Sequence, residues 1–480
     1  MKLTINDTAK DEKIDEYQEN IIKEIIEKVP ETDYEKALEE NPTLEKVIML
    51  SSICQNLINW YPFKKGASAL EIGANFGELT GFLCDNLQVI VAIEPSKIKA
   101  QAISKRYLKK DNLRIVSDIA SNIKIEEKFD YVLIHNIENQ EENIEKLLEI
   151  AENCLKDDGT IFLAVPNSLS IKRLNCVDIS TQNYDENNQY SKKQIETILQ
   201  EMKKYFYKFY YPLPDEKTPN VIFTDEHLPS NESVLRDLTL YKKDEFVKTD
   251  ERTIYRNLLK ENPELFTTFA NSFLVEISKK PIENTIKYVT FGNSRKPEYR
   301  LKTVMEKDFV YKTATQEKAQ KHIERIQKNI EILKNSNIYL LDSSENNVVC
   351  SKLIKEQKSF DKELLQLAKQ FGTQKIIEPI KSFERELLEK LEKSEQTEQT
   401  VFDKYEIKCK NKENLHFIKY GIFDLIFQNC FVIDNKFYFY DQEWIEENVP
   451  IEFILYRAIY YLGNSERKID VKMLYKELRS

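Results

Sequence analysis

The feature that most constrains the fold is a glycine-bearing turn between a short apolar segment and a helical one. The turn reads Glu71-x-Gly73-x-x-x-Gly77, and four of the nine glycines of the chain lie between residues 66 and 81. Glycine permits a positive φ and lets a ligand approach the backbone. The helix after such a turn directs N–H groups at whatever binds there. The apolar residues 67–72 therefore predict a strand that ends in a ligand-binding loop.

Strands and helices alternate after this turn. The predicted strands cover residues 89–93, 113–116, 129–134 and 160–165, and the predicted helices cover about 96–109 and 141–155. This alternation is typical of an α/β fold with a doubly wound parallel sheet, whose ligand lies at the carboxyl ends of the strands. Glu94 follows the second strand, where a carboxylate can accept both hydroxyls of a ribose. Asp118 follows the third strand.

The ordered motifs resemble the class I S-adenosylmethionine (SAM) methyltransferases over about residues 66–167, whereas a dinucleotide fold would show the pattern GxGxxG. The resemblance implies a Rossmann-like methyltransferase sheet. The residues that it assigns to SAM are Glu71, Gly73, Asn75, Gly77, Glu94 and Asp118. Gly73 and Gly77 would frame the amino-acid part, Glu94 would bind the ribose, and Asp118 would lie near the adenine. The alternative is a Rossmann-like fold that has lost its ligand.

The catalytic requirement of such an enzyme is modest. SAM carries its own leaving group, so the protein mainly positions an acceptor in line with the methyl group. A hydroxyl acceptor needs a base, whereas a phosphate or carboxylate acceptor does not. His135, just beyond the fourth strand, is the base candidate. The alternative is an ordinary loop histidine.

Two further segments complete this part of the chain. Residues 1–60 are predicted to form a helical cap, and residues 61–280 a methyltransferase domain with an acceptor-side insertion. The aromatic stretch 205–214 and residues 271–276 predict two late strands, with the aromatic side chains in the core or, alternatively, stacked on a sugar. The candidate acceptor contacts are Asp225, Glu226 and His227.

A second constellation of polar residues lies in the last third of the chain. Its members are Lys312, Asp424, Asn429, Asp441 and Glu443. Lys312 lies in the middle of a predicted strand, and a predicted hairpin at 430–440 separates Asp424 and Asn429 from the two following acids. In phosphoryl transfer, one aspartate takes the acceptor proton, while an asparagine and a second aspartate hold Mg²⁺ on the phosphates.

This order resembles a protein-kinase-like α+β fold of the small-molecule kinase type over residues 281–480. The resemblance implies ATP and Mg²⁺ as cofactors, with Asp424 as the base. It implies metal ligands at Asn429, Asp441 and Glu443. Lys312 would touch the phosphates and pair with an acid on the next helix, such as Glu324.

The same segment departs from the kinase pattern. Gly292 is the only glycine in the expected phosphate-covering loop, and Phe423 precedes Asp424 where kinases have His-Arg. Asp441 is followed by Gln-Glu-Trp in place of Phe-Gly. A catalytically inactive pseudokinase that serves as an adaptor is therefore the alternative for this domain.

Composition and charge limit the function further. The chain has 81 acidic and 71 basic side chains, a net charge of −10, which disfavours a generally basic nucleic-acid binder. Seven scattered cysteines and only four histidines argue against structural zinc and fit reduced thiols in a cytosol. No apolar run approaches the ~20 residues that a transmembrane helix needs. We expect a cytoplasmic protein without a transmembrane segment.

The order of the two modules resembles the bifunctional methyltransferase–kinases that cap bacterial O-antigen polysaccharides. This resemblance implies a glycan or phosphoglycan acceptor and a glycosyltransferase or membrane-associated assembly partner, which would place the protein at the inner face of the membrane. The alternatives are a methyltransferase with an inactive adaptor, a methyltransferase for small metabolites, and a non-enzymatic assembly factor.

Overall fold

The computed structural model divides the chain into two compact units, Met1–Asn293 and Ser294–Ser480. The boundary lies 13 residues after the predicted one at 280/281, so residues 281–293 belong to the first unit. The structure describes residues 2–11, 15–28, 34–40, 42–175, 188–202, 205–230, 250–355, 357–394, 399–409, 412–465 and 469–479. Parts of the predicted acceptor-side insertion, residues 176–187 and 231–249, lie outside the described residues.

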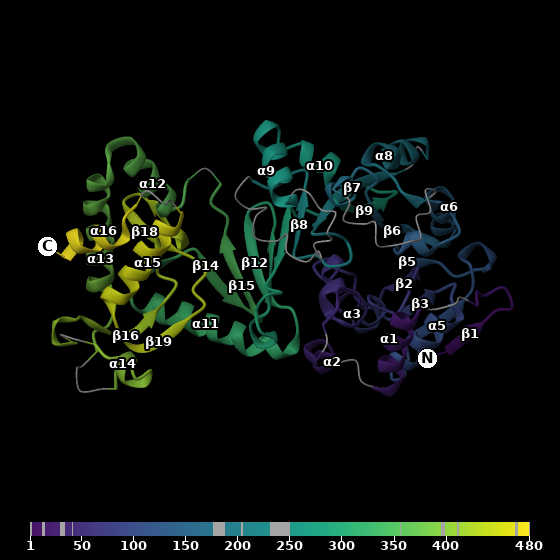
Figure 1. Ribbon diagram of the computed structural model, residues 1–480, viewed down its shortest axis with the longest axis horizontal. Coiled ribbons are helices and arrows are strands. Elements are labelled where there is room, and N and C mark those ends of the chain that lie inside the picture. Colours follow the sequence, from purple (N-terminus) through teal and green to yellow (C-terminus); the bar gives the residue numbers. More distant parts are fainter. Residues whose placement is uncertain are drawn as a thin grey trace. The chain divides into compact units, whose positions relative to one another are not determined.

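The first unit is built on one large sheet (Figure 1). Its strands are β1 (Lys2–Ile5), β2 (Ser68–Ile72), β3 (Val89–Ile93), β4 (Leu113–Ser117), β5 (Phe129–Ile134), β6 (Leu155–Pro166), β7 (Phe206–Leu213), β8 (Val221–Thr224), β9 (Ser272–Ser278) and β10 (Tyr288–Phe291). They lie in the order β1-β4-β3-β2-β5-β6-β9-β7-β8-β10. Neighbours from β1 to β6 are parallel, and neighbours from β6 onward are antiparallel. The predicted strands and the parallel sheet are confirmed.

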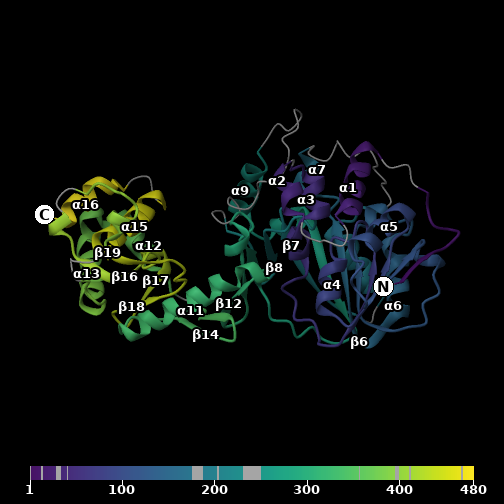
Figure 2. The ribbon, with the colours of Figure 1, turned by 90° about the horizontal axis from the view of Figure 1, so that it is seen from below.

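The helices of the first unit cover both faces of this sheet. They are α1 (Glu16–Glu27), α2 (Glu35–Glu40), α3 (Leu44–Leu50), α4 (Thr80–Asn86), α5 (Lys97–Arg106), α6 (Ile144–Cys154), α7 (Ile171–Leu174), α8 (Lys192–Glu201), α9 (Glu251–Glu261) and α10 (Leu265–Phe269), with short 3₁₀ turns η1 (Ser52–Leu57), η2 (Ala120–Asn122) and η3 (Ile137–Asn139). Leu70 and Ile72 of β2 join one core with α6, α8, α9 and α10. A separate apolar cluster lies between helix α1 and helix α5, which pack side by side (Figure 1 and Figure 2). Because successive strand residues face opposite sides, one sheet serves both layers.

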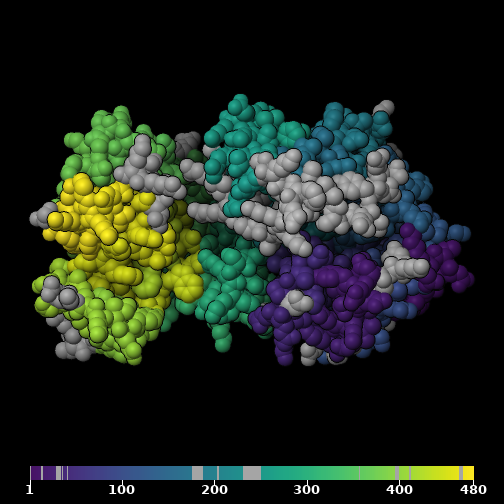
Figure 3. All heavy atoms as spheres, in the orientation of Figure 1, coloured from purple at the N-terminus to yellow at the C-terminus, as the bar shows by residue number. Residues whose placement is uncertain are grey.

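The N-terminal segment was predicted to be helical, but it begins with a strand. β1 pairs in parallel with the outer edge of β4, with Lys2 opposite Arg114 and Ile5 opposite Ser117. The helices and turns α1, α2, α3 and η1 follow it and form part of the unit's surface, coloured purple in Figure 3. The elements α1, α2, α3 and η1 thus supply the predicted helical cap, and residues 2–5 extend the sheet.

The second unit combines short strands with helices. Its strands are β11 (Leu301–Met305), β12 (Phe309–Ala314), β13 (Tyr339–Leu340), β14 (Asp342–Glu345), β15 (Val348–Lys352), β16 (Phe417–Ile422), β17 (Cys430–Ile433), β18 (Lys436–Phe439) and β19 (Ile445–Pro450). Its helices are α11 (Gln320–Asn335), α12 (Phe360–Phe371), α13 (Ile377–Lys390), α14 (Val401–Lys404), α15 (Ile451–Ser465) and α16 (Val471–Arg479), with 3₁₀ turns η6 (Pro297–Tyr299), η7 (Glu317–Ala319), η8 (Thr373–Ile376), η9 (Lys412–Asn414) and η10 (Phe427–Asn429).

Two local predictions in this unit are confirmed. The hairpin at 430–440 forms as β17 and β18, and its turn residues Asp434 and Asn435 both have a positive φ, as a two-residue hairpin turn requires. Helices α12 and α13 bury their apolar stripes, with Leu364 and Leu387 in one core that also receives α15. The unit is mixed α and β, as expected. Across the described part of the whole chain, no helix is long and apolar enough to cross a membrane.

Candidate functional site

The glycine-bearing turn lies at the carboxyl end of β2 and has an unusual backbone. Gly73, Asn75 and Gly77 have φ values of +87°, +48° and +82°. Asparagine is among the few residues other than glycine that adopt this left-handed conformation readily. The sequence pattern therefore produces a loop that has left-handed backbone at alternate residues, at positions that glycine and asparagine adopt readily.

Both glycines also have a reason to be glycine that involves no ligand. A Cβ added at Gly73 would lie 2.0 Å from the carbonyl oxygen of His135, and one added at Gly77 would lie 2.8 Å from the Tyr107 ring. The Tyr107 hydroxyl in turn donates to the carbonyl of Gly77 at 2.6 Å. A substitution at either glycine would disturb packing, so it would not test ligand binding cleanly.

His135 is held by hydrogen bonds to both of its ring nitrogens. The amide of Asn136 donates to Nδ1 at 3.0 Å, so Nε2 carries the hydrogen and donates to Glu71 at 3.1 Å. Glu71 is fully buried, and its other oxygen accepts from Thr80 at 2.6 Å. His135 therefore donates a hydrogen bond to a buried acid, and no ring nitrogen remains for the predicted role as a base.

Glu94 ends β3 beside the turn, where the sequence places it. Its Oε2 accepts the backbone N–H of Asn75 at 2.6 Å, and its Oε1 accepts that of Ser96 at 3.0 Å. The carboxylate is buried and joins the turn to the start of α5. It thus fixes the loop conformation and lies at the predicted ribose position.

Asp118 has a different role from the predicted contact with adenine. Its carboxylate accepts from Asn6 and Thr8 at 2.8 Å each and from Asn122 at 3.2 Å. The backbone N–H of Ile119 donates to it as well. Burial alone would raise the pKa of Asp118, but these hydrogen bonds lower it. Asp118 fastens the segment that follows β1 to the end of β4.

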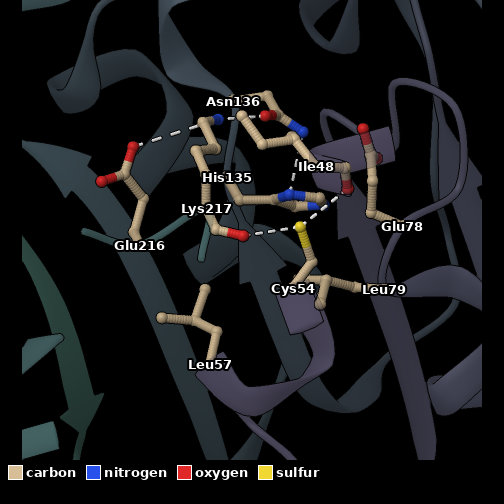
Figure 4. A pocket seen from close by; sticks show the side chains of 9 residues that line it. All are labelled: Ile48, Cys54, Leu57, Glu78, Leu79, His135, Asn136, Glu216 and Lys217. Carbon is tan, nitrogen blue, oxygen red and sulfur yellow. Dashed lines mark hydrogen bonds and ion pairs between the residues drawn. The ribbon is translucent and has the colours of Figure 1, made fainter. Parts of the chain in front are cut away.

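A small cavity lies at the carboxyl ends of β2, β5 and β7 (Figure 4). It is lined by Ile48, Cys54 and Leu57 of the cap, Glu78 and Leu79 after the turn, His135 and Asn136 after β5, and Glu216 and Lys217 after β7. Its volume is about 20 Å³, enough for a water-sized group, whereas ligand pockets usually measure about 300–1,000 Å³. A larger ligand therefore requires displacement of the cap.

The cavity contains one well-paired cation and two poorly paired acids. Lys217 forms an ion pair with Glu138 at 2.8 Å and a hydrogen bond with the Asn136 amide oxygen. Glu216 approaches Lys217 only to 4.0 Å, and no described residue donates a hydrogen bond to its carboxylate. Burial raises the pKa of Glu216 to about 7, although Lys217 opposes the shift.

Glu78 is the second of these acids. Its Oε1 accepts from the Asn75 amide at 2.5 Å, but its buried Oε2 has no partner in the described part of the chain. Burial raises the pKa of Glu78. Burial also raises the pKa of Cys54, whose thiol donates to the Lys217 carbonyl at 2.7 Å, so this cysteine ties the cap down and is no nucleophile.

Gln140, beside the turn, supplies the strongest sign of a missing ligand. The side chain is buried, and neither its oxygen nor its nitrogen has a hydrogen-bond partner among the described residues. Its Nε2 would lie 3.2 Å from a Cβ at Gly73. Buried polar groups are rarely left without partners, so such a group calls for a ligand or water. Gln140 and Glu78 therefore fit a polar molecule such as SAM at this turn.

Sequence reasoning missed Gln140, Glu78, Glu216 and Lys217. Each stands within a few residues of a strand end or the glycine turn, which is the signal that could have found them. The predicted acceptor contacts do not line the cavity. Asp225 accepts from Tyr211, Glu226 pairs with Lys208 and Lys287, and His227 stacks with Phe223 and Tyr288.

The polar constellation of the second unit comes together around Lys312. This lysine, on β12, forms an ion pair with Asp441 and a 3.0 Å ion pair with Glu443. Asn429 donates to the backbone carbonyls of Asp424 and Asp441, at 3.3 and 3.4 Å. The structure thus brings together all five residues that the sequence singled out here.

The lysine pairs with different acids from the one expected. Glu324 is exposed, and His322, two residues before it on α11, faces the cluster instead, 3.4 Å from Glu443. Glu443 also accepts from Arg295 at 2.5 Å. Although burial opposes the shift, His322, Lys312 and Arg295 hold the pKa of Glu443 well below its usual range. Glu443 is fully engaged and does not fit the predicted role of metal ligand.

Asp424 is buried at the end of the same network. Its Oδ2 accepts the backbone N–H groups of Glu443 and Trp444, both at 3.0 Å. Burial, and then the charge of Asp441, raises the pKa of Asp424 to about 6. No group of three or more His, Cys, Asp or Glu side chains within the described ranges is arranged to hold a metal ion. The metal-ligand roles of Asn429 and Asp441 stay predictions.

A larger cavity of about 490 Å³ also lies in the second unit. It is lined by Arg325, Lys328 and Asn329 of α11, by residues 399–404 and by β19. The members of the Lys312 cluster do not line it. The cavity touches the cluster only indirectly, since Asn329 donates to the backbone carbonyl of Gln442 at 3.1 Å.

Comparison with known proteins gives structural likenesses alone. No family model matches the chain, and no curated protein matches it. Among similar solved structures is a Haemonchus contortus phosphoethanolamine N-methyltransferase in complex with phosphoethanolamine and S-adenosylhomocysteine (SAH), with 15% identity, a TM-score of 0.30, and coverage of 41% of this chain and 44% of that one. This chain therefore spans less than half the length of that relative.

For two bacterial structures, the similarity to this chain extends over almost their whole length. A possible histamine N-methyltransferase from Thermotoga maritima has 15% identity and a TM-score of 0.32, over 52% of this chain and 98% of that one. A SAM-dependent methyltransferase from Thiobacillus denitrificans, solved with SAH, has 13% identity and a TM-score of 0.28, over 55% and 98%. Likenesses of this size do not define the chemistry of this chain, which has to be inferred from its own residues.

Proposed function

We propose that the first unit is a SAM-dependent methyltransferase whose ligand binds at the carboxyl ends of β2, β3 and β5. The observation that carries this proposal is the buried, unpartnered Gln140 amide beside the Gly73–Gly77 turn. Ligands of doubly wound sheets bind at this edge. The turn and Gln140 supply the backbone and polar groups that a nucleoside with an amino-acid tail would engage, and Glu94 holds the turn in shape.

SAM, when bound, would supply an activated methyl group that already carries its leaving group. The residues of this chain therefore have to hold and orient the two reactants and exclude water. Asn75 and Glu94 hold the turn in shape, and the cap closes the cavity above it. Because Asp118 is fully engaged by the N-terminal segment, we do not assign it to the cofactor.

The test is titration calorimetry of the intact chain with SAH, using Gln140→Met and the exposed control Gln88→Met. Replacing an unsatisfied buried amide by an apolar side chain of similar shape is neutral or stabilising for folding. We expect Gln140→Met to keep its stability but bind SAH about tenfold more weakly, a loss of about 1.4 kcal/mol. Absence of SAH binding to the wild-type chain would refute the proposal.

A second candidate function concerns the second unit, where we infer phosphoryl transfer from ATP. The supporting observation is the convergence of Lys312, Asp441, Asn429 and Asp424 at the end of a hairpin. Lys312 would neutralise phosphate charge, and Asp424, with its raised pKa, would receive a proton from an acceptor hydroxyl. An inactive adaptor is the competing proposal.

Thermal-shift measurements with ATP, with and without Mg²⁺, separate these two proposals. A ligand that binds the native state raises its apparent stability. We expect MgATP to stabilise the wild-type chain and the control Lys321→Met, but not Lys312→Met. No shift in the wild-type chain would favour the adaptor. The glycan acceptor and the assembly partner implied by the resemblance stay proposals, to be tested with glycan acceptors in the methyl-transfer assay.

A further inference from the structure

The cavity of the first unit contains more carboxyl groups than its own cation can pair with. Lys217 already pairs with Glu138 at 2.8 Å, and His135 is committed to Glu71. Glu78 and Glu216 therefore remain, both more than nine-tenths buried. Burying a carboxylate without a close partner is costly, and such a site gains stability from a bound cation.

We propose that this cavity receives the amine of the methyl acceptor, with Glu216 as its counter-ion and proton acceptor. The inference rests on the proposed methyltransferase function and narrows its substrate class to amines. Glu216 lines the cavity from the β7 side, opposite the glycine turn, and accepts no hydrogen bond from any described residue. The present volume of about 20 Å³ suits a group the size of an ammonium, which resembles a water molecule in size.

Charge and proton chemistry both favour an amine over other acceptors. A phosphate or carboxylate acceptor would be repelled by Glu78 and Glu216. An ammonium has to lose a proton before its nitrogen can attack, and it is a much stronger acid than a hydroxyl, so it is the better match for a carboxylate whose pKa is about 7. Glu78, next to the turn, lies on the side of the methyl donor, so Glu216 is the acid assigned to the acceptor.

Methyl transfer to the amine needs one proton transfer and the exchange of one bond for another. The ammonium gives one proton to the Glu216 carboxylate, which leaves a nitrogen lone pair. That nitrogen forms the new N–C bond to the methyl group, while the bond from sulfur to the methyl carbon breaks and its electron pair stays on sulfur. The products are a methylated ammonium and SAH, and Glu216 returns its proton to water.

Four charged groups other than Glu78 influence the protonation of Glu216, namely Lys217, Asp215, Glu138 and Lys172.

The experiment compares three probes of matched size and different charge: n-butylamine, n-butanol and butyrate. Their binding to the intact chain, without SAM, is measured by saturation-transfer NMR and by calorimetry in buffers of different ionisation enthalpy. We expect the amine to bind at least about tenfold more tightly than the alcohol. The amine should also release a proton near neutral pH, because a bound ammonium favours the charged form of Glu216.

The variants locate the effect. Glu216→Gln should remove the preference for the amine and the proton release but leave SAH binding unchanged. Glu226→Gln, which changes an acid that follows β8 and lies outside the cavity, should behave like the wild-type chain. Equal binding of the amine and the alcohol to the wild-type chain would overturn the inference, even if Glu216→Gln failed to fold. SAH binding is measured separately, so loss of the methyltransferase proposal and loss of the amine proposal give different results.

Discussion

At the scale of single residues, the site is defined by which polar groups have partners. His135 and Glu71 satisfy each other, and Glu94 is bonded to two backbone N–H groups. Gln140 and Glu216 lack hydrogen bonds from the described residues. Paired groups hold the loop in shape, and unpaired groups remain for ligands. On this distinction we propose Glu216, and not His135, as the base.

The structural role of His135 predicts a loss of stability on its removal. His135→Leu removes the imidazole hydrogen bond to the buried Glu71, which keeps the one from Thr80, so we expect the free energy of unfolding to fall by about 2 kcal/mol. Urea unfolding measures the change, and His416→Gln, at a mostly exposed side chain, is the control. Unchanged stability together with lost methyl transfer would instead support His135 as the base.

The raised pKa of Glu216 predicts how stability depends on pH. The folded chain favours the protonated form, so this contribution is complete below about pH 4.5 and is lost as pH rises through about 7. The free energy of unfolding should fall over this interval by on the order of 2 kcal/mol. Glu216→Gln should make this fall smaller, while Glu251, whose pKa burial also raises to about 7, continues to contribute. Parallel curves for the variant and the wild-type chain would show that another group titrates.

At the scale of elements, β1 depends on one carboxylate at the end of its neighbour. Asp118 accepts from Asn6 and Thr8, which directly follow β1. This bonding holds a four-residue edge strand that has little else to specify it. Asp118 thus acts as a clamp for the N-terminal segment.

Asp118→Asn should therefore loosen β1 selectively. The pKa of Asp118 is lowered in the folded chain, so its contribution is present above the unfolded pKa and is lost as pH falls through the folded one. Hydrogen exchange should show faster exchange of residues 2–8 in the variant at neutral pH, and in the wild-type chain only in acid. Asp111→Asn, at an exposed position, is the control. Uniform exchange across all three chains would contradict the clamp.

The elements that the sequence predicts well are those specified locally. The turn at Gly73, the strand 129–134 and the hairpin at 430–440 each carry their own pattern of apolar and turn residues. β1 was missed because a short edge strand is defined by its partner β4 and not by its own residues. The roles of His135 and Glu324 could not be predicted, because they depend on side chains brought from distant positions.

At the scale of the whole molecule, two compact units each have their own core and their own polar site. Multidomain chains of this kind often unfold in more than one step. The central interactions also differ, with the Gly73–Gly77 turn in one unit and the Lys312–Glu443 cluster in the other. Stability and ligand binding are therefore expected to be assignable unit by unit.

Calorimetric unfolding should resolve this division. We expect two unfolding transitions. SAH should raise the midpoint temperature of one of them, because only the first unit carries the turn. Glu443→Gln should lower the midpoint temperature of the other transition by several degrees, because it leaves Lys312, Arg295 and His322 without their shared acid. A single transition that shifts as a whole with both changes would contradict independent units.

The measurement that tests the central claim most directly is a crystal structure of the intact chain with SAH. The account predicts ligand density at the carboxyl ends of β2, β3 and β5, within hydrogen-bond reach of the Gln140 amide, with the cap displaced from its present contact. Density at another place, or an unchanged cavity at saturating SAH, would contradict the assignment of this edge as a methyltransferase site.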